Sequence, residues 1–548
     1  SSVDGMREFG FKHALTQDVA YSTLPKTERR DLHLQVGSWV EDVAAGRGAE
    51  LAEIAAYHLE RALEYGEDSP EVRSRCCELL LVAGEGAIAR VAPDPAARLL
   101  ARGLELADDP RQRVRALLGL GRANLMAADL DRSHGRFTEA RDAADALGDR
   151  RLLAEALSWL SRASWVTGRW QEALPEASAA VEALSGLEET PQLARALARL
   201  SQLEMLNGLP RAEERAHEAI RVAQSVGDVH AELNARVNLL VSVTNRGVPL
   251  DVAGARDIVS RAVASGDALE AHRCLVNALW TGQAHMAREE LDEALEGLQE
   301  LVAGVPAVEG LDVYFELSYA HLVDVPAGRW ERLGRLLARS RELSETRQSG
   351  VQLLSNELVG GTAMRRGDLA GAAQPLAAHR ALASAAAEPQ RLIPMACVVM
   401  PYAALTGDLE TVRDVAETVL GTTDREWAQL TTTPIPRALA VAGEAELLAR
   451  TADAFAAKSR GVSAPRIALG ALVAEGLLLL AAGRADEASA KLQAAAEHER
   501  RLGWVYRAAC LDHDLARALE AAGRREEAAR ARDRAAAVLE PLGCVNPY

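Results

Sequence analysis

The chain has 548 residues, of which 49% are hydrophobic and only 4% aromatic, and its formal net charge is −17. This length exceeds what one hydrophobic core organises, so we expect several domains or a repeat array, built from Ala, Leu and Val in closely packed helices rather than sheets. The acidic balance argues against nucleic-acid and anionic-membrane partners, because a negative surface repels phosphate and anionic lipid.

The cysteines predict an intracellular chain. Cys76 and Cys77 are adjacent and no CxxC pair exists, so we interpret the thiols as reduced and buried rather than as metal ligands. No secretory signal is visible, and the most membrane-like run, IALGALVAEGLLLLAAG, contains Glu475 and is interpreted as a buried helix. We therefore expect a cytoplasmic protein without a membrane span or a metal. The absence of an initial Met at Ser1 predicts that the sequence is part of a longer protein.

The opening segment, Phe9 to Glu41, reads FGFKHALTQDVAYSTLPKTERRDLHLQVGSWVE and does not repeat. Pro25 predicts the first turn of a new helix, because proline fits the N-terminal positions of helices. Arg29 and Arg30 on that helix could contact another domain, although such a pair is usually a solvated face. His13, taken alone, could simply pack or cap within a small helical bundle.

A short pattern recurs through the rest of the chain: a helix end, a glycine with a polar residue, then an acidic helix start containing Ala. Its glycines are Gly168, Gly208, Gly247, Gly328, Gly367, Gly407, Gly443, Gly483 and Gly523, with Arg288 in the glycine's place in MAREELDEA. A second set, Gly148, Gly227 and Gly266, lies roughly halfway between them. Two turns in each unit of about 40 residues leave two helices of about 15 residues, and glycine supplies the left-handed conformation that ends a helix.

These hairpins resemble tetratricopeptide repeats, in a lengthened form, from roughly Cys76 to Gly543. The resemblance predicts an all-α fold in which residues 71–548 form an α-solenoid of about 11–12 hairpins after a short helical segment, residues 1–70. It implies a groove, lined by the first helix of each hairpin, for a protein or peptide partner or a small-molecule effector.

Polar side chains in otherwise apolar first helices are the candidates for that groove. Asn234 and Asn238 stand four residues apart on one helix face, and Asn277, Trp280 and His285 are expected in the next first helix. An inward-facing Asn can hydrogen-bond a peptide backbone. The same side chains could instead be solvated or bonded between helices.

The opening segment resembles the end of the winged-helix module that follows the nucleotide-binding core in signal-transducing ATPases with numerous domains, the STAND class. Bacterial ATPase-containing adenylate/guanylate cyclases and large ATP-binding transcriptional regulators are the most similar branches. The matching positions are Phe11, His13, Leu15, Asp18, Ala20, Tyr21, Arg29, Arg30, Leu32 and His33, followed by Tyr57 and His58. The resemblance implies that His13 touches the β-phosphate of bound ADP and that Arg29, Arg30 and His33 belong to a joint between domains.

The phosphate-binding loop G-x-x-x-x-G-K-[ST] of such ATPases does not occur in the sequence. ATP or ADP is therefore expected on an upstream domain rather than on this chain, and the chain itself is expected to be non-catalytic and to carry no cofactor. Two functions follow. The chain is a sensor arm that relays the binding of an effector or partner to an upstream nucleotide switch, or it is a free-standing scaffold for protein–protein interaction.

Overall fold

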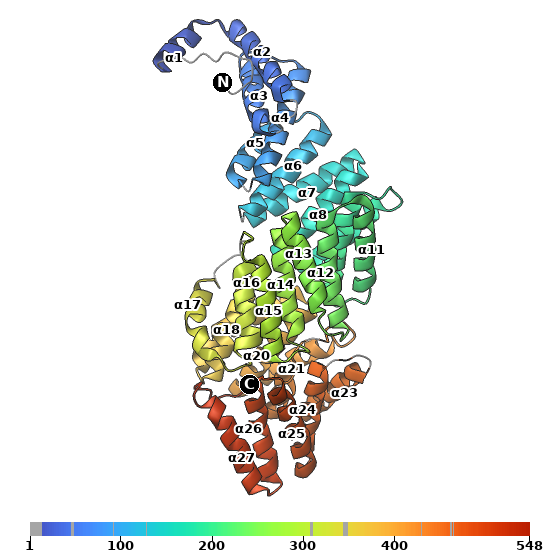
Figure 1. Cartoon of the computed structure of the whole chain (residues 1–548), viewed down its shortest axis with the longest axis vertical. Coiled ribbons are helices and arrows are strands. Elements are labelled where there is room, and N and C mark those ends of the chain that lie inside the picture. The colour runs from blue at the N-terminus through green and yellow to red at the C-terminus, as the bar shows by residue number, and fades with distance from the viewer. Residues whose placement is uncertain are drawn as a thin grey trace. The chain divides into compact units, whose positions relative to one another are not determined.

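The structure, a computed structural model, describes residues 14–44, 49–90, 92–127, 129–306, 311–343, 349–428, 430–460, 463 and 465–548. All regular structure within these ranges is helical, so the predicted all-α fold is confirmed (Figure 1). The chain divides into two compact units, Ser1–Ala163 and Ser164–Tyr548, called unit 1 and unit 2 below.

Unit 1 consists of α1 (Ala14–Thr23), α2 (Lys26–Ala44), α3 (Ala49–Glu64), α4 (Pro70–Ala89), α5 (Pro93–Leu106), α6 (Pro110–Met126), α7 (Leu130–Leu147) and most of α8 (Arg150–Val166). The first half of unit 2 holds α9 (Trp170–Leu184), α10 (Pro191–Leu206), α11 (Ala212–Val226), α12 (Val229–Asn245), α13 (Val252–Ser265), α14 (Ala268–Gly282), α15 (Arg288–Val302), α16 (Leu311–Tyr319), a π-helical turn η1 (Ala320–Asp324), a 3-10 turn η2 (Trp330–Arg332) and α17 (Leu333–Leu343). The second half holds α18 (Ser349–Arg365), α19 (Leu369–Ala386), α20 (Pro389–Thr406), α21 (Leu409–Leu420), α22 (Pro434–Ala442), α23 (Ala445–Arg460), α24 (Pro465–Ala481), α25 (Ala485–Arg501), α26 (Val505–Ala521) and α27 (Arg525–Leu539).

The predicted turn glycines have the conformation expected of them. Every glycine named in the two sets above has a positive φ, as in Gly227, Gly266, Gly367 and Gly407. At each of these four the next residue is an aspartate whose side chain accepts a backbone N–H of the following helix, which is an N-cap. Glycine thus ends one helix and aspartate starts the next, so the Gly-Asp dipeptide fixes a hairpin turn within two residues.

The core is built mainly from Ala and Leu, as the composition predicted. In unit 1, Ala52, Ala56 and Leu59 of α3 pack with Cys76, Leu80 and Leu81 of α4. Small side chains at such contacts let helix axes approach closely. The five cysteines of the inner core are buried and free, and Cys544 is half-buried. The boundary predicted near residue 70 stays a prediction. The helices on its two sides, α3 and α4, share one core.

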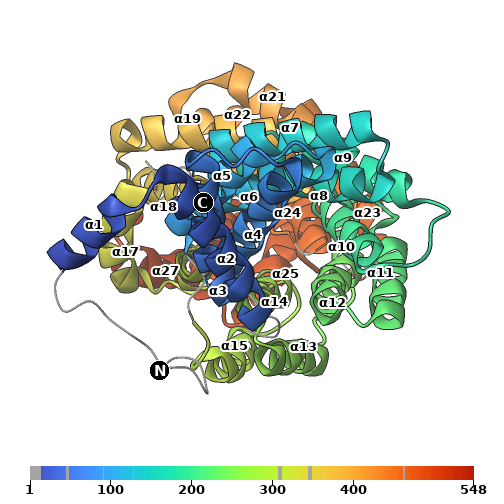
Figure 2. The same cartoon turned by 90° about the horizontal axis from the view of Figure 1, so that it is seen from above.

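In unit 2 a second turn of the solenoid lies against the first. Main-chain bonds join Glu426 N to the Gly208 oxygen, Ala428 N to the Asn245 oxygen and Tyr506 N to the Pro326 oxygen. Side-chain bonds join positions separated by 182 to 223 residues. Seen from above, α11, α13, α15, α19 and α21 lie at the rim (Figure 2). The first helices of the hairpins therefore face inward and are covered by the chain itself.

Successive turns of the solenoid approach each other closely in unit 2, and this predicts unequal effects of two glycine substitutions. A Cβ at Gly208 would lie 2.7 Å from the Glu426 carbonyl oxygen, whereas a Cβ at Gly407 would meet nothing within 4 Å. Both residues have a positive φ, so alanine costs about 1 kcal/mol of conformational strain at either site. We expect Gly208→Ala to lower the melting temperature several degrees further than Gly407→Ala in thermal unfolding. Equal losses in the two variants would refute the contact between turns.

Candidate functional site

Four of the residues that match the family pattern meet in a cluster formed by α1, α2 and α3, called the joint cluster below: Tyr21, Arg29, His33 and His58. The Tyr21 hydroxyl lies 2.8 Å from His33 Nε2 and donates to the Tyr65 hydroxyl at 3.1 Å. His33 Nδ1 lies 2.8 Å from His58 Nδ1. The Arg29 guanidinium covers the Tyr21 ring, 4.7 Å from its centroid. Residues that the resemblance selected on separate helices therefore touch one another.

The hydrogen bonds of the joint cluster form a directed chain when both imidazoles are neutral. His58 Nδ1–H donates to His33 Nδ1, His33 Nε2–H donates to Tyr21, and Tyr21 donates to Tyr65. Burial lowers the pKa of both histidines, and the neighbouring His58 lowers that of His33 further. With both rings neutral, each of these hydrogen bonds has one donor and one acceptor, so the neutral state links the three helices.

The predicted joint residues differ in their surroundings. His33 is buried, and Arg29 donates to the Ser22 carbonyl oxygen at 2.8 Å. Arg30 forms only an exposed ion pair with Asp31, which is the solvated face named as its alternative. His13 lies outside the described residues. Whether these side chains contact another domain stays a prediction.

The predicted groove asparagines make their hydrogen bonds within the chain. Asn238 is fully buried and donates to the Ala198 carbonyl oxygen and to Ser201 Oγ, both at 2.9 Å. Asn234 shares its helix face, as predicted, and donates to Glu270 at 2.8 Å. Asn277 donates to the Arg273 carbonyl oxygen. These are the interhelical and local bonds that the alternative described, and a role in binding stays untested.

Trp280 and His285 lie at different places. Trp280 is on α14, where its Nε1 donates to Ser318 Oγ at 3.1 Å. The placement of His285 in a first helix was wrong: α14 ends at Gly282, and the chain turns through i→i+3 bonds such as His285 N to Gly282 oxygen before α15 begins. Of the predicted groove residues, Trp280 lines a cavity.

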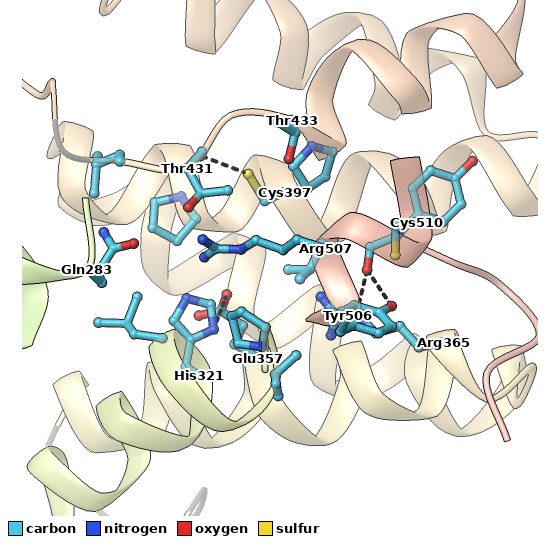
Figure 3. A pocket seen from close by; sticks show the side chains of 18 of the residues that line it. Gln283, His321, Glu357, Arg365, Cys397, Thr431, Thr433, Tyr506, Arg507 and Cys510 are labelled. Carbon is cyan, nitrogen blue, oxygen red and sulfur yellow. Dashed lines mark hydrogen bonds and ion pairs between the residues drawn. The ribbon is translucent and has the colours of Figure 1, made fainter. Parts of the chain in front are cut away.

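That cavity has a volume of about 80 Å³ and lies among the inner helices of unit 2 (Figure 3). Its walls come from both turns of the solenoid: α14, η1 and α18 from the first, and α20, residues 430–437, α26 and the C-terminal Tyr548 from the second. The apolar part of the wall includes Leu322, Val398 and Leu511. A space of this size accommodates a few water molecules or a small ligand.

Two buried ion pairs lie beside the cavity, and in one of them Arg466 Nε has no hydrogen-bond partner. Arg437 donates to Asp514 at 2.5 Å and to the Cys510 carbonyl oxygen. Arg466, 1% exposed, donates to Glu499 at 2.8 Å and to the Gln283 carbonyl oxygen at 2.6 Å. Buried charges paired and hydrogen-bonded in this way are expected structural features of a helical interior.

Glu357 of α18 is not satisfied in this way. It is 1% exposed, and neither carboxyl oxygen has a hydrogen-bond partner. His321 Nδ1 lies 3.3 Å from one oxygen and His379 Nε2 3.9 Å from the other, without hydrogen-bond geometry. Burial raises the pKa of Glu357 to about 8 and lowers those of His321 and His379 to about 3 and about 4. At neutral pH the carboxyl group is therefore protonated and both imidazoles are uncharged.

Arg507 of α26 faces the same cavity. Figure 3 shows its side chain crossing the cavity between Thr431 and His321. Its Nη1 has no hydrogen-bond partner, and burial, together with the nearby Arg466, lowers its pKa to about 9. Glu357, Thr431 and Arg507 were not identified from the sequence. A charged residue inside an apolar inner helix, as in LLSNELVGG, is the signal that could have indicated Glu357.

Comparison with known proteins found solved structures of low similarity to the chain. No protein-family model and no curated protein matches the chain. The apo form of RapI is 11% identical with a TM-score of 0.41, over 50% of this chain and 96% of that chain. Aspartyl phosphate phosphatase F from Bacillus subtilis is 14% identical (TM-score 0.37; 54% and 76% covered), and the APC/C hetero-tetramer Cut9-Hcn1 is 12% identical (0.42; 87% and 88%). Similarity this low supports no inference about function. Separately, no described helix is both long and apolar enough to cross a membrane.

The buried carboxyl group of Glu357 predicts a pH-dependent effect of Glu357→Gln. An acid whose folded pKa is about 8 binds its proton more tightly than the unfolded chain, whose pKa is about 4.3, so it removes stability as the pH rises between these values. The amide cannot ionise. We expect the variant to melt near the wild-type temperature at pH 5 and roughly 2–5 °C above it at pH 8.

The histidines facing Glu357 titrate in both proteins and largely cancel in this difference. Glu296→Gln, at an exposed position of α15, serves as the matched control and should show no such trend. A difference between Glu357→Gln and wild type that stays constant from pH 5 to pH 8 would mean that the carboxyl group ionises in its usual range.

Proposed function

We propose that the chain is the non-catalytic sensor arm of a multidomain signalling ATPase. The helices α1 to α3 form the joint to an upstream nucleotide-binding domain, and the helical repeats bind an effector whose occupancy is relayed through that joint. The proposal joins the resemblance of the opening segment to the geometry of the joint cluster. Protein scaffolding without a nucleotide switch is the competing function.

The observation that carries this proposal is the exposed apolar face of the joint. Leu32 and Trp39 stand seven residues apart on one face of α2, and each is 42% exposed. Ile54 and Tyr57 stand three apart on α3 and are 46% and 48% exposed. These apolar side chains are left exposed on two adjacent helices, and exposed large apolar residues at such spacing are typical of a surface that another domain covers.

The inside of the joint supports the same reading. Tyr21, His33 and His58 are the positions that match the family pattern, and they are the residues that bond the three helices together. A rigid joint is required of a relay, because a flexible one would lose the differential free energy that distinguishes two nucleotide states. The domain that covers Leu32 and Trp39 is, in this proposal, the nucleotide-binding domain that precedes the joint in the family.

The proposal predicts that the natural full-length chain retains ADP or ATP through purification and that Trp39→Glu disturbs it. A carboxylate in the apolar contact opposes docking of the joint, so we expect basal ATP hydrolysis to change about fivefold or more. Native mass spectrometry measures nucleotide retention, and phosphate release measures hydrolysis.

Val263→Glu is the matched control, because Val263 is a 36% exposed apolar residue on α13, far along the chain from the joint. It should leave both measurements unchanged. A full-length chain that carries no nucleotide, and on which Trp39→Glu has no effect, would leave the scaffold as the function.

A further inference from the structure

Three polar groups that lack a hydrogen-bond partner face the cavity of unit 2 from three different segments. They are the carboxyl group of Glu357 on α18, the Oγ1 of Thr431 in the loop before α22, and Nη1 of Arg507 on α26. Buried polar atoms are almost always hydrogen-bonded in folded proteins. An isolated exception can be a local accident of packing, whereas three that converge on one cavity indicate a group that binds them all.

The three groups share a hydrogen-bonding character. A guanidinium only donates, a hydroxyl can donate, and a protonated carboxyl group donates through its O–H. His379 Nδ1–H donates to the Leu353 carbonyl oxygen, so its Nε2 is unprotonated; this atom lies 3.9 Å from the carboxyl group, beyond hydrogen-bond distance, and the Glu357 O–H remains available to a ligand. The cavity thus presents three donors and calls for an acceptor with several lone pairs.

Charge balance separates a ligand from water. Arg437 and Arg466 each have a carboxylate, Asp514 and Glu499, and Arg365 donates to the Tyr548 carbonyl oxygen. Among the described residues, neither Arg365 nor Arg507 forms an ion pair within 4.0 Å, and Arg507 in addition leaves Nη1 without a hydrogen-bond partner. Water can satisfy its hydrogen bonds but cannot neutralise its charge in a low-dielectric interior, whereas an anion does both.

We propose that the cavity binds a small monocarboxylate of a few non-hydrogen atoms, held by Arg507, Thr431 and Glu357. The carboxylate oxygens accept from the three donors, with Arg507 supplying the opposite charge. The short apolar body of the ligand lies against Leu322, Val398 and Leu511. The cavity volume of about 80 Å³ favours a short acid.

This inference rests on the proposed sensor role, since it names the chemical class of the effector. The two can nevertheless fail separately. Carboxylate binding is measured on this chain alone, and the sensor role is measured by nucleotide retention in the natural full-length protein.

The test is thermal unfolding of the chain in chloride buffer with formate, acetate or propionate, against formamide, acetamide and propionamide as neutral analogues of the same shape. We expect at least one carboxylate to raise the melting temperature by about 2–4 °C at saturation, and the amides to have no effect. Isothermal titration calorimetry should give one site per chain. Phosphate tests whether any anion suffices.

Arg507→Met separates a binding arginine from a structural one. It keeps the apolar stem and removes the uncompensated charge, so the ligand-free variant should melt at or above the wild-type temperature and lose the carboxylate-dependent shift. Arg501→Met, at an exposed position of α25, should keep the shift. Thr431→Val removes one donor with little change in volume and should weaken carboxylate binding roughly 5- to 10-fold.

Several outcomes would overturn the proposal. They are no shift with any carboxylate, equal shifts with carboxylates and amides, a shift with phosphate alone, or an Arg507→Met variant that is less stable than wild type and retains the shift. If Arg507→Met does not fold, undiminished binding to Thr431→Val overturns it equally.

Discussion

The contact between successive turns of the solenoid in unit 2 is the interaction on which the rest of that unit depends. Backbone bonds such as Glu426 N to Gly208 oxygen require main chain to touch main chain, and glycine at the turn makes that possible. A repeat array without such contacts has an inner face open to water. Here the first helix of each hairpin is buried on nearly every side. This explains why α24 reads as an almost continuous apolar run, with buried residues on all its faces.

The contact between successive turns of the solenoid also determines which inner polar groups are structural and which are available for binding. A polar side chain on a covered inner helix has to find a partner within the chain, and most do. Asn238 bonds to α10, and Arg466 spans the two turns by binding both Glu499 and the Gln283 carbonyl oxygen. Glu357 and Arg507 line the same cavity, and both carboxyl oxygens of Glu357 and Nη1 of Arg507 lack a hydrogen-bond partner. Other buried side chains, such as Ser355 and Trp504, also have an atom without a hydrogen-bond partner, so the evidence for a ligand is that these groups face one cavity.

The sequence predicted the features that local chemistry determines. Helical periodicity and the Gly-Asp turns lie within a few residues of one another, so the fold class and the hairpin turns could be predicted and are confirmed. The cavity could not be, because Glu357, Thr431 and Arg507 meet only through the pitch of the solenoid. That pitch accumulates from small rotations between repeats, which a single sequence does not encode in any short pattern. The same reason explains Asn238, whose partners lie on the preceding hairpin.

The position of the cavity suggests how a bound ligand would affect the contact between the turns of unit 2. Its wall includes α18 from one turn of the solenoid and α26 from the next, so an anion bound to Arg507 and Glu357 would link the two turns directly. Without the anion, the guanidinium of Arg507 and the carboxyl group of Glu357 weaken the same contact, since each is buried with a polar atom that has no hydrogen-bond partner. Binding therefore acts on the interaction that holds unit 2 closed, and a ligand of few atoms can change the stiffness of many helices because the turns are bonded in series.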